Sequence, residues 1–316
     1  MTATRQVIID CDPGQDDAVM LLMALASTDE LDIKGITTVA GNVPLALTQR
    51  NARIMCDLAG NTAMPVFAGC DSPIERELVT AENVHGSTGI DGVEIYDPAT
   101  PLEDLHAVDF IINTLMSAED DSITLVPTGP LTNIGLAIQR EPAISPKIRE
   151  IVLMGGALRE GGNTTTSAEF NIFVDPRAAD LVLHCGRPVT IAPLDVSHQV
   201  LVTPEWLERI RALDSAVSRA TVGMLEFFNR FDSHKYGTVG APLHDPCTIA
   251  WLLQPELFKG KLCNVEVEME SALTMGHTAV DFWGVTGREH NVNWLYEINP
   301  DGFFELLINR LGRYET

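Results

Sequence analysis

Basic residues are scarce in this sequence of 316 residues, where 21 Lys and Arg stand against 44 Asp and Glu and give a formal charge of −23. A chain of that sign repels phosphate backbones and anionic lipid head groups. Long apolar runs are absent too, because the longest, Ala18 to Ala26, is far shorter than the roughly 20 residues that a membrane-spanning helix needs. We therefore expect neither a nucleic acid nor a membrane as a partner.

No pair of cysteines has the spacing of a redox motif or a zinc site. The six cysteines form no CxxC pair; they are Cys11, Cys56, Cys70, Cys185, Cys247 and Cys263. No signal peptide precedes the strand-like segment that begins at Val7. Free thiols of this kind are typical of a reducing compartment, so the sequence predicts a cytoplasmic protein without disulfides.

Short apolar segments alternate with longer helical patterns through the first two thirds of the chain. The predicted strands are Val7–Ile9, Ile33–Val39, Val66–Ala68, Ile123–Val126, Ile151–Met154 and Val189–Ala192. This order predicts an α/β fold with an open, mostly parallel, Rossmann-like sheet flanked by helices. Apolar and polar residues alternate at 265–269 and 292–298, which predicts a few antiparallel strands near the C-terminus. With no linker or repeat in the sequence, we expect residues 1–316 to form a single domain.

Four carboxylates crowd the segment DCDPGQDDA, residues 10–18, between the first apolar strand and the first apolar helix. Two unit charges about 4 Å apart repel by about 4 kcal/mol at the effective dielectric near a protein surface. A helix N-terminus offsets only about 0.3 to 1 kcal/mol per charge, so either protonation or a cation must compensate the rest. A solvated, helix-capping acidic turn is the alternative reading, but a hard divalent cation accounts for the segment better.

The positions of these carboxylates separate their roles. Asp12 follows Asp10 on the same side of an extended segment and lies nearer the open end of the sheet, so Asp12 is the better metal ligand. Asp16 and Asp17 point about 100° apart on a helix, so we expect one to hold metal and the other substrate. An all-oxygen site without thiol or imidazole favours Ca²⁺ or Mg²⁺ over zinc.

With these residues in view, the sequence resembles the nucleoside hydrolases, the inosine-uridine nucleoside N-ribohydrolase family. DCDPGQDDA is similar to the N-terminal signature of that family, and further blocks follow in order: TVAGN, NVHGSTGIDG, VPTGPLTN, VLMGGA, AEFNIFVDP and GAPLHDPCTIAWLL. The HGSTGIDG and YGTVGAPLHDPCTIAWLL segments look closest to the pyrimidine-preferring bacterial members. The resemblance implies hydrolysis of the N-glycosidic bond of uridine or cytidine to ribose and free base, a Ca²⁺ cofactor and a homo-oligomer, either a tetramer or a dimer.

The resemblance also implies roles for individual residues. The Ca²⁺ ligands would be Asp12, Asp17, the backbone carbonyl of Thr128 and Asp245, with Asp12 also the general base. Asp16 would bind the ribose hydroxyls, together with Asn42, the Met154 carbonyl, Asn163, Glu169 and Asn171. At the nucleobase end the candidates are His85, Tyr236 and His244, which we consider as donors to the departing base. We place His244 beside Asp12 among the catalytic residues.

Several of these residues also have structural readings. Asp245 precedes Pro246 and a helical run, as Asp175 precedes Pro176, so either aspartate could simply cap a helix; for Asp175 we keep that reading. Thr128 could merely end a strand, and Asn163 lies in a turn-forming, glycine-rich segment. Glu169 and Asn171 alternate with apolar residues, which predicts two polar side chains on one face of a short extended piece.

Three rival functions remain open from the sequence. Asp10 and Asp12 form a DxD after an apolar strand, as in Mg²⁺-dependent haloacid dehalogenase-like phosphatases, although Pro13 and Gly14 depart from that pattern. A non-catalytic protein could use the same cation to bind ribose. A purine-preferring or non-specific nucleoside hydrolase is the third alternative.

Overall fold

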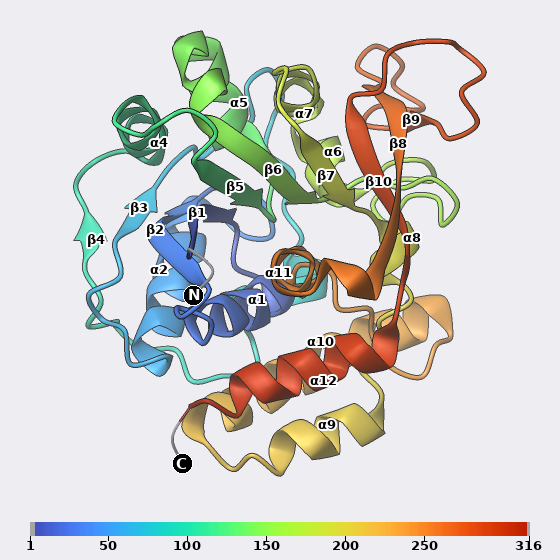
Figure 1. The fold of residues 1–316 in the computed structure, drawn as a ribbon. Coiled ribbons are helices and arrows are strands. Elements are labelled where there is room, and N and C mark those ends of the chain that lie inside the picture. Colours follow the sequence, from blue (N-terminus) through green and yellow to red (C-terminus); the bar gives the residue numbers. More distant parts are fainter. Residues whose placement is uncertain (1–3, 315–316) are drawn as a thin grey trace.

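A mixed sheet runs through the computed structural model, which describes residues 4–314, apart from the side chains of residues 231–236. Its ten strands lie in the order β4-β3-β2-β1-β5-β6-β7-β10-β8-β9, and Figure 1 shows the sheet from β4 to β9. The strands are β1 (Arg5–Cys11), β2 (Leu31–Thr38), β3 (Val66–Ala68), β4 (Leu102–Glu103), β5 (Ile123–Pro127), β6 (Ile148–Met154), β7 (Val189–Ala192), β8 (Phe258–Val267), β9 (Thr278–Asp281) and β10 (Val292–Ile298).

The predicted fold class is confirmed, with two differences at the C-terminal end of the sheet. β1 to β7 pair in parallel, and β8 pairs antiparallel with both β10 and β9. β10, predicted as antiparallel, also pairs in parallel with β7 and so joins the two halves of the sheet. The first antiparallel strand ends at Val267, so Met269 of the predicted alternation lies beyond it.

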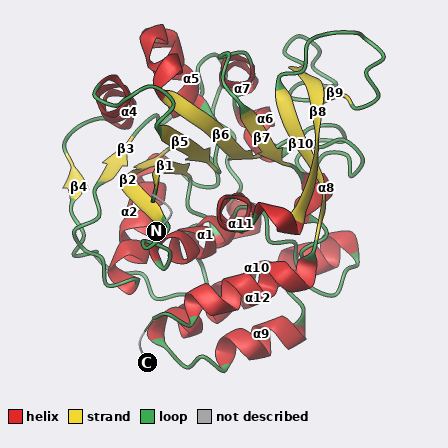
Figure 2. Ribbon diagram, viewed as in Figure 1, coloured by secondary structure: helices red, strands yellow, loops and turns green. Residues whose placement is uncertain are grey.

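Helices cover both faces of the sheet (Figure 2). α4 (Ala107–Met116), α5 (Thr132–Arg140) and α7 (Pro176–Leu183) lie on one face, while α1 (Gln15–Leu25), α2 (Leu45–Leu58) and α11 (Pro246–Leu253) lie on the other. Beyond α1 and α11, α9 (Pro204–Arg211), α10 (Ala216–Tyr236) and α12 (Pro300–Leu311) add a further layer. Three short helices complete the set: α3 (Glu82–His85), α6 (Phe170–Val174) and α8 (Leu194–Ser197).

The two faces of the sheet carry two separate apolar cores. Along β1, Val7 and Ile9 belong to the core beneath α1, whereas Ile8 belongs to the core beneath α4, α5 and α7. This alternation follows from the two-residue period of a strand. α1 is buried along its whole length, since α2, α10, α11 and α12 pack around it. After its polar first residues the helix is apolar on all sides from Ala18 to Leu25, as expected for a helix in that position.

β1 marks the point at which the strand order reverses. The chain leaves β1 for β2 on one side, and β5 later pairs with β1 on the other side. In open α/β sheets, ligands bind in the crevice beyond the carboxyl ends of the strands at such a point. No helix among the described residues is both long and apolar enough to cross a membrane.

Candidate active site

The acidic segment forms the turn between β1 and α1. β1 ends at Cys11 and α1 begins at Gln15, so Asp12 lies in the turn and Asp16 and Asp17 lie in the first turn of the helix. The Gly14 backbone N–H donates to Asp17 Oδ2 over 3.1 Å. A carboxylate that accepts from the first N–H groups of a helix also benefits from the helix dipole, which explains in part why acidic residues are tolerated here.

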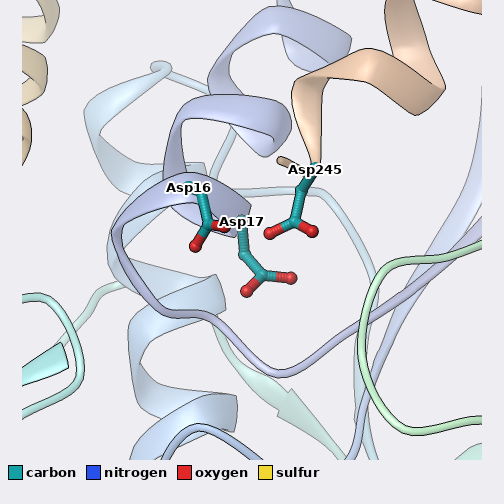
Figure 3. Close-up of side chains that lie close together, drawn as sticks. All are labelled: Asp16, Asp17 and Asp245. Atoms are coloured by element: carbon teal, nitrogen blue, oxygen red, sulfur yellow. The ribbon is translucent and has the colours of Figure 1, made fainter. Parts of the chain in front are cut away.

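Asp16, Asp17 and Asp245 place one carboxylate oxygen each within 4.8 Å of one another, and all three residues are buried. Figure 3 shows these three side chains, which we call the acidic group, directed from the starts of α1 and α11 toward a shared space. Asp245 precedes α11 but its carboxylate accepts no capping hydrogen bond, so it does not act as the cap that its sequence allows. The sequence predicts that one of Asp16 and Asp17 holds metal and the other substrate. In the structure, both carboxylates belong to this group.

Asp12 lies outside the acidic group but next to it in the fold. Its Oδ2 accepts a hydrogen bond of 2.7 Å from the backbone N–H of Asn42, and its carboxylate fills the space between Gly41 and Gly129. A Cβ atom would come within 2.1 Å of Oδ2 at Gly41 and within 2.5 Å of Oδ1 at Gly129. Both glycines are therefore required for the close approach of backbone to carboxylate.

Burial raises the pKa values of these carboxylates above their ordinary range. The pKa is raised to about 6 for Asp17 and to about 8 for Asp16, where repulsion by Asp17 adds to burial. Burial, followed by repulsion from other carboxylates of the site, also raises the pKa values of Asp12 and Asp245. The charged form of the cluster is unfavourable unless positive charge compensates it.

Two buried oxygens show where such compensation is missing. Asp12 Oδ1 and Asp16 Oδ1 are inaccessible to solvent and accept no hydrogen bond from any residue that the structure describes. An unpartnered buried carboxylate oxygen is costly. Carboxylate and carbonyl oxygens are the ligands that Ca²⁺ and Mg²⁺ prefer, and the residues present therefore fit a hard divalent cation.

Thr128 and Asn42 brace the acidic side chains. The Thr128 hydroxyl donates to Asp17 Oδ1 over 2.7 Å, and Asn42 Nδ2 donates to Asp17 Oδ2 over 3.1 Å. The Thr128 carbonyl accepts a hydrogen bond of 2.7 Å from Asn171 Nδ2. Thr128 directly follows the last residue of β5, as its strand-ending reading predicts, and both its hydroxyl and its carbonyl contact predicted site residues.

A cavity of about 190 Å³ opens beside the acidic group. It brings together most of the predicted site residues, namely Asp16, Asn42, His85, Thr128, Met154, Asn163, Glu169, Asn171, His244 and Asp245. Asp12 and Asp17 are not among its lining residues. Tyr236 ends α10, and its side chain is outside the described residues.

One wall of the cavity is built from the segment after β6. Glu169 accepts hydrogen bonds from the backbone N–H groups of Asn171, Ile172 and Gly156, and burial raises its pKa to about 7. It is thus the N-cap of α6, and the prediction of a short extended piece was wrong. The helix forms because the Glu169 side chain satisfies N–H groups that its first turn leaves unpaired.

Asn171 and Asn163 hold this wall in place. Asn171 Nδ2 donates to the Thr128 carbonyl and, over 3.2 Å, to the Met154 carbonyl. Asn163 Oδ1 accepts a hydrogen bond of 2.9 Å from the Phe170 N–H. Two amide groups predicted to bind a sugar therefore also have structural contacts: Asn171 joins the ends of β5 and β6 to α6, and Asn163 holds its own loop against the start of α6.

Aromatic rings gather at another part of the cavity lining, which we call its aromatic end. Phe228 of α10 stacks on His85 with ring centroids 5.6 Å apart and meets His244 edge-on at 6.5 Å. His244 Nδ1 lies 2.7 Å from the Ser197 hydroxyl oxygen. Sequence reasoning missed Phe228, since nothing in the sequence separates one buried phenylalanine of a helix from an ordinary core residue.

Two further buried aspartates have other partners. Asp175 caps α7 as predicted, because its carboxylate accepts from the Ala178 N–H, and it also accepts from the Thr132 hydroxyl and the Ile74 N–H. Asp10 Oδ1 accepts from the Thr37 hydroxyl at 2.6 Å and from Asn133 Nδ2 at 2.8 Å, and Asp10 does not line the cavity.

Comparison with known proteins agrees with this geometry. Residues 7–305 match the family model described as inosine-uridine preferring nucleoside hydrolase. The pyrimidine-specific ribonucleoside hydrolase RihA of Photobacterium profundum is 46% identical over 312 residues, which cover 98% of this chain and 100% of that protein.

Solved structures of nucleoside hydrolases have the same fold. A plant nucleoside hydrolase superposes with a TM-score of 0.90 at 30% identity, covering 98% of this chain and 99% of its own. The purine-preferring ribonucleoside hydrolase of Gardnerella vaginalis also reaches 0.90, at 32% identity, with 98% of both chains covered. Proteins with this fold thus include both pyrimidine-specific and purine-preferring hydrolases.

Proposed function

The chain belongs to the inosine-uridine preferring nucleoside hydrolase family and hydrolyses the N-glycosidic bond of ribonucleosides, and from this premise we propose a calcium-dependent enzyme that prefers uridine and cytidine. The observation that carries the proposal is the buried acidic group beside the cavity, with Asp12 next to it and two carboxylate oxygens without hydrogen-bond partners. The family is generally metal-dependent, and we propose that the metal in this protein is calcium.

Calcium suits these donors better than magnesium does. Asp12, Asp17, the Thr128 carbonyl and Asp245 would hold the ion; three of them are carboxylates and one is a backbone oxygen. Ca²⁺ accepts six to eight such oxygens in flexible geometry, whereas Mg²⁺ demands a near-ideal octahedron and keeps several waters. When bound, the cation supplies positive charge that orients a water and lowers its pKa.

Within this site, Asp12 would take the proton from the attacking water as general base. Asp16, Asn42, Asn163, Glu169, Asn171 and the Met154 carbonyl would hold the ribose hydroxyls. Loss of the base leaves an oxocarbenium-like ribosyl cation, and contacts to the hydroxyls can strengthen as that charge develops. The buried carboxylates beside the cavity favour the same positive charge.

The aromatic end of the cavity would receive the base. His85 and His244 line it, and Tyr236 ends the same helix that supplies Phe228. The pyrimidine preference is supported by 46% identity to a pyrimidine-specific relative, against 32% to a purine-preferring one. We place His244 there as the catalytic contact to the departing base.

The match of residues 7–305 to the nucleoside hydrolase model disfavours the phosphatase alternative. In that reading Asp10 would attack the substrate, but Asp10 does not line the cavity, its Oδ1 accepts hydrogen bonds from Thr37 and Asn133, and its Oδ2 is buried without a partner among the described residues. The remaining question is which nucleoside is cleaved and with which ion.

Release of free ribose from uridine, cytidine and inosine, measured side by side with and without a chelator, tests the proposal. We expect uridine and cytidine to be cleaved faster than inosine, and the chelator to abolish all three activities until Ca²⁺ is added back. Faster cleavage of inosine would reject the pyrimidine preference. Tight uridine binding without ribose release would reject catalysis in favour of a binding protein.

Exposed apolar side chains support an oligomer. Leu262 on β8 and Trp283 and Val285 just after β9 are 62%, 79% and 84% exposed, and exposed apolar residues gathered in one region are typical of interaction sites. We propose a homodimer or homotetramer that covers them. Trp283→Ser should lower the mass measured by light scattering, while Met116→Ser, at an exposed residue of α4, should leave it unchanged.

The whole chain would act as one domain, since a single sheet includes strands from residue 5 to residue 298. A cytoplasmic location would agree with the six cysteines, which are all free thiols.

A further inference from the structure

Gln15, the residue between DPG and DD in the acidic segment, is wholly buried and does not line the cavity. Its Nε2 donates to two backbone carbonyls, that of His85 over 2.8 Å and that of Asp91 over 3.3 Å. A carbonyl can only accept a hydrogen bond. The amide nitrogen must therefore face these two carbonyls, and the orientation of the Gln15 side chain is fixed.

This orientation decides which nitrogen of His85 carries the proton. Gln15 Oε1 lies 2.8 Å from His85 Nδ1, and an amide oxygen has no proton to donate. His85 Nδ1 must therefore be the donor, and in a neutral imidazole Nε2 is then an unprotonated acceptor. Burial lowers the pKa of His85 to about 3, which keeps the ring neutral at ordinary pH.

The neighbours of the ring hold it in this position. A Cβ atom at Gly14 would approach Nδ1 to 2.4 Å, so the Nδ1 edge rests directly on the Gly14 backbone. Phe228 stacks against the ring face with an interplanar angle of 23°. His85 lines the cavity, and its Nε2 forms no hydrogen bond with any residue that the structure describes.

We propose that Gln15 is a positioning residue that locks His85 as the Nδ1–H tautomer, so that His85 presents an acceptor to the nucleobase and recognises an N–H donor such as the N3–H of uracil. This inference rests on the proposed function, because it assumes that the base occupies the aromatic end of the cavity. It also differs from the donor role that we considered for His85 from its position in the sequence.

Substrate analogues test the recognition in the unaltered protein. 3-Methyluridine lacks the N3–H, whereas 5-methyluridine carries its added methyl elsewhere and keeps that N–H. Leaving a buried acceptor unpaired costs about a factor of 10 to 100, so we expect kcat/KM for 3-methyluridine to fall at least tenfold below that for uridine. 5-Methyluridine should stay within about threefold of uridine, since it loses no hydrogen bond. Equal cleavage of 3-methyluridine and uridine would overturn the acceptor role.

A variant and a spectroscopic measurement test the lock itself. Gln15→Met keeps a long side chain but removes the oxygen that faces Nδ1. Gln199→Met is the matched control, because Gln199 Nε2 also donates to two carbonyls, of Asp195 and Tyr296, without touching His85. We expect discrimination between uridine and 3-methyluridine to shrink at least threefold in Q15M and to persist in Q199M.

The tautomer is read directly from the ring ¹⁵N shifts of histidine-labelled protein, with His85→Asn used to assign the signals. The expected result is a protonated Nδ1 in the unaltered protein and in Q199M, and a mixture of tautomers in Q15M. A protonated Nε2 in the unaltered protein would overturn the proposal, even if Q15M failed to fold. Because the spectrum needs no turnover, it separates this inference from the proposed function, which fails instead if uridine is not cleaved at all.

Discussion

Asp175 and Asp245 have the same local sequence, an aspartate followed by a proline at the start of a buried helix, yet their carboxylates act differently. Asp175 accepts three hydrogen bonds and caps α7. Asp245 accepts no capping bond at α11 and joins Asp16 and Asp17 instead. The local motif permits a cap in both cases, and the residues that the fold brings to each aspartate decide whether the cap forms.

The largest expected effect comes from neutralising the aspartate that does not cap. Asp245→Asn should lower kcat/KM for uridine by about 10³-fold, or roughly 4 kcal/mol, because the cation loses a ligand. The free energy of unfolding of the metal-free protein should not fall, since a buried repulsive charge is removed. Ribose release and urea unfolding measure the two quantities; full activity in D245N would place Asp245 with Asp175 as a structural residue.

The second prediction concerns the dependence of stability on pH when no cation compensates the carboxylates. The pKa values of Asp16 and Asp17 are raised in the folded chain to about 8 and about 6. Between about pH 4 and pH 8 the folded form therefore binds more protons than the unfolded form, and its stability falls as the pH rises. The Tm of metal-free protein should drop by several degrees from pH 5 to pH 8.

Calcium should oppose the fall in Tm between pH 5 and pH 8. The ion competes with protons for the carboxylates, and it displaces them more easily at high pH. The increase in Tm on adding Ca²⁺ should thus be larger at pH 8 than at pH 5, as scanning calorimetry can show. A metal-free protein whose Tm rises steadily from pH 5 to pH 8 would contradict the origin that we assign to these pKa shifts.

Neutralising the capping aspartate, Asp175, should have the opposite effect, with a loss of stability and little change in activity. Both carboxylate oxygens of Asp175 accept hydrogen bonds. Asp175→Asn replaces one of them with an NH2 group that cannot accept, and should lower the free energy of unfolding by about 2 kcal/mol. The kcat/KM for uridine should stay within about threefold, since Asp175 does not line the cavity. Denaturation and assay of the same preparation check both, and an activity loss as large as in D245N would erase the contrast.

The smallest expected effect concerns a hydroxyl that braces the acidic group. Thr128→Val keeps the backbone carbonyl but removes the donor to Asp17 Oδ1, and should weaken Ca²⁺ binding by about tenfold, as loss of an outer hydrogen bond does at other metal sites. Thr124→Val, in the strand that Thr128 directly follows, is the control, because its buried hydroxyl has no hydrogen-bond partner among the described residues. Calcium titration should show no change for T124V; equal weakening in both variants would mean that packing in β5, and not this hydroxyl, is responsible.

The parallel core of the fold was predictable from the sequence because buried strands appear as continuous apolar runs. β1, β5 and β6 lie where the runs at Val7, Ile123 and Ile151 predict them. β10 was harder, since its alternating pattern indicates one wet face but not its neighbours, and the strand pairs in parallel on one side and antiparallel on the other.

In the site, too, some features could be predicted from the sequence and others could not. The acidic part of the site was predictable from the sequence, because charged residues so close in sequence must also lie close in space. α6 was missed because a capping side chain and an extended polar face share the same alternation at Glu169 and Asn171. Phe228 was missed because its place at the cavity depends on how α10 packs over α1, which no local pattern records.

Equilibrium dialysis of metal-depleted samples against Ca²⁺ can measure how many ions the unaltered protein, D245N and D175N bind, and so whether Asp245 is a ligand. If Asp245 holds the cation, the unaltered protein and D175N should each bind one ion tightly per chain, and D245N should lose that ion. Equal calcium uptake by D245N and the unaltered protein, or no uptake by either, would contradict this role of Asp245.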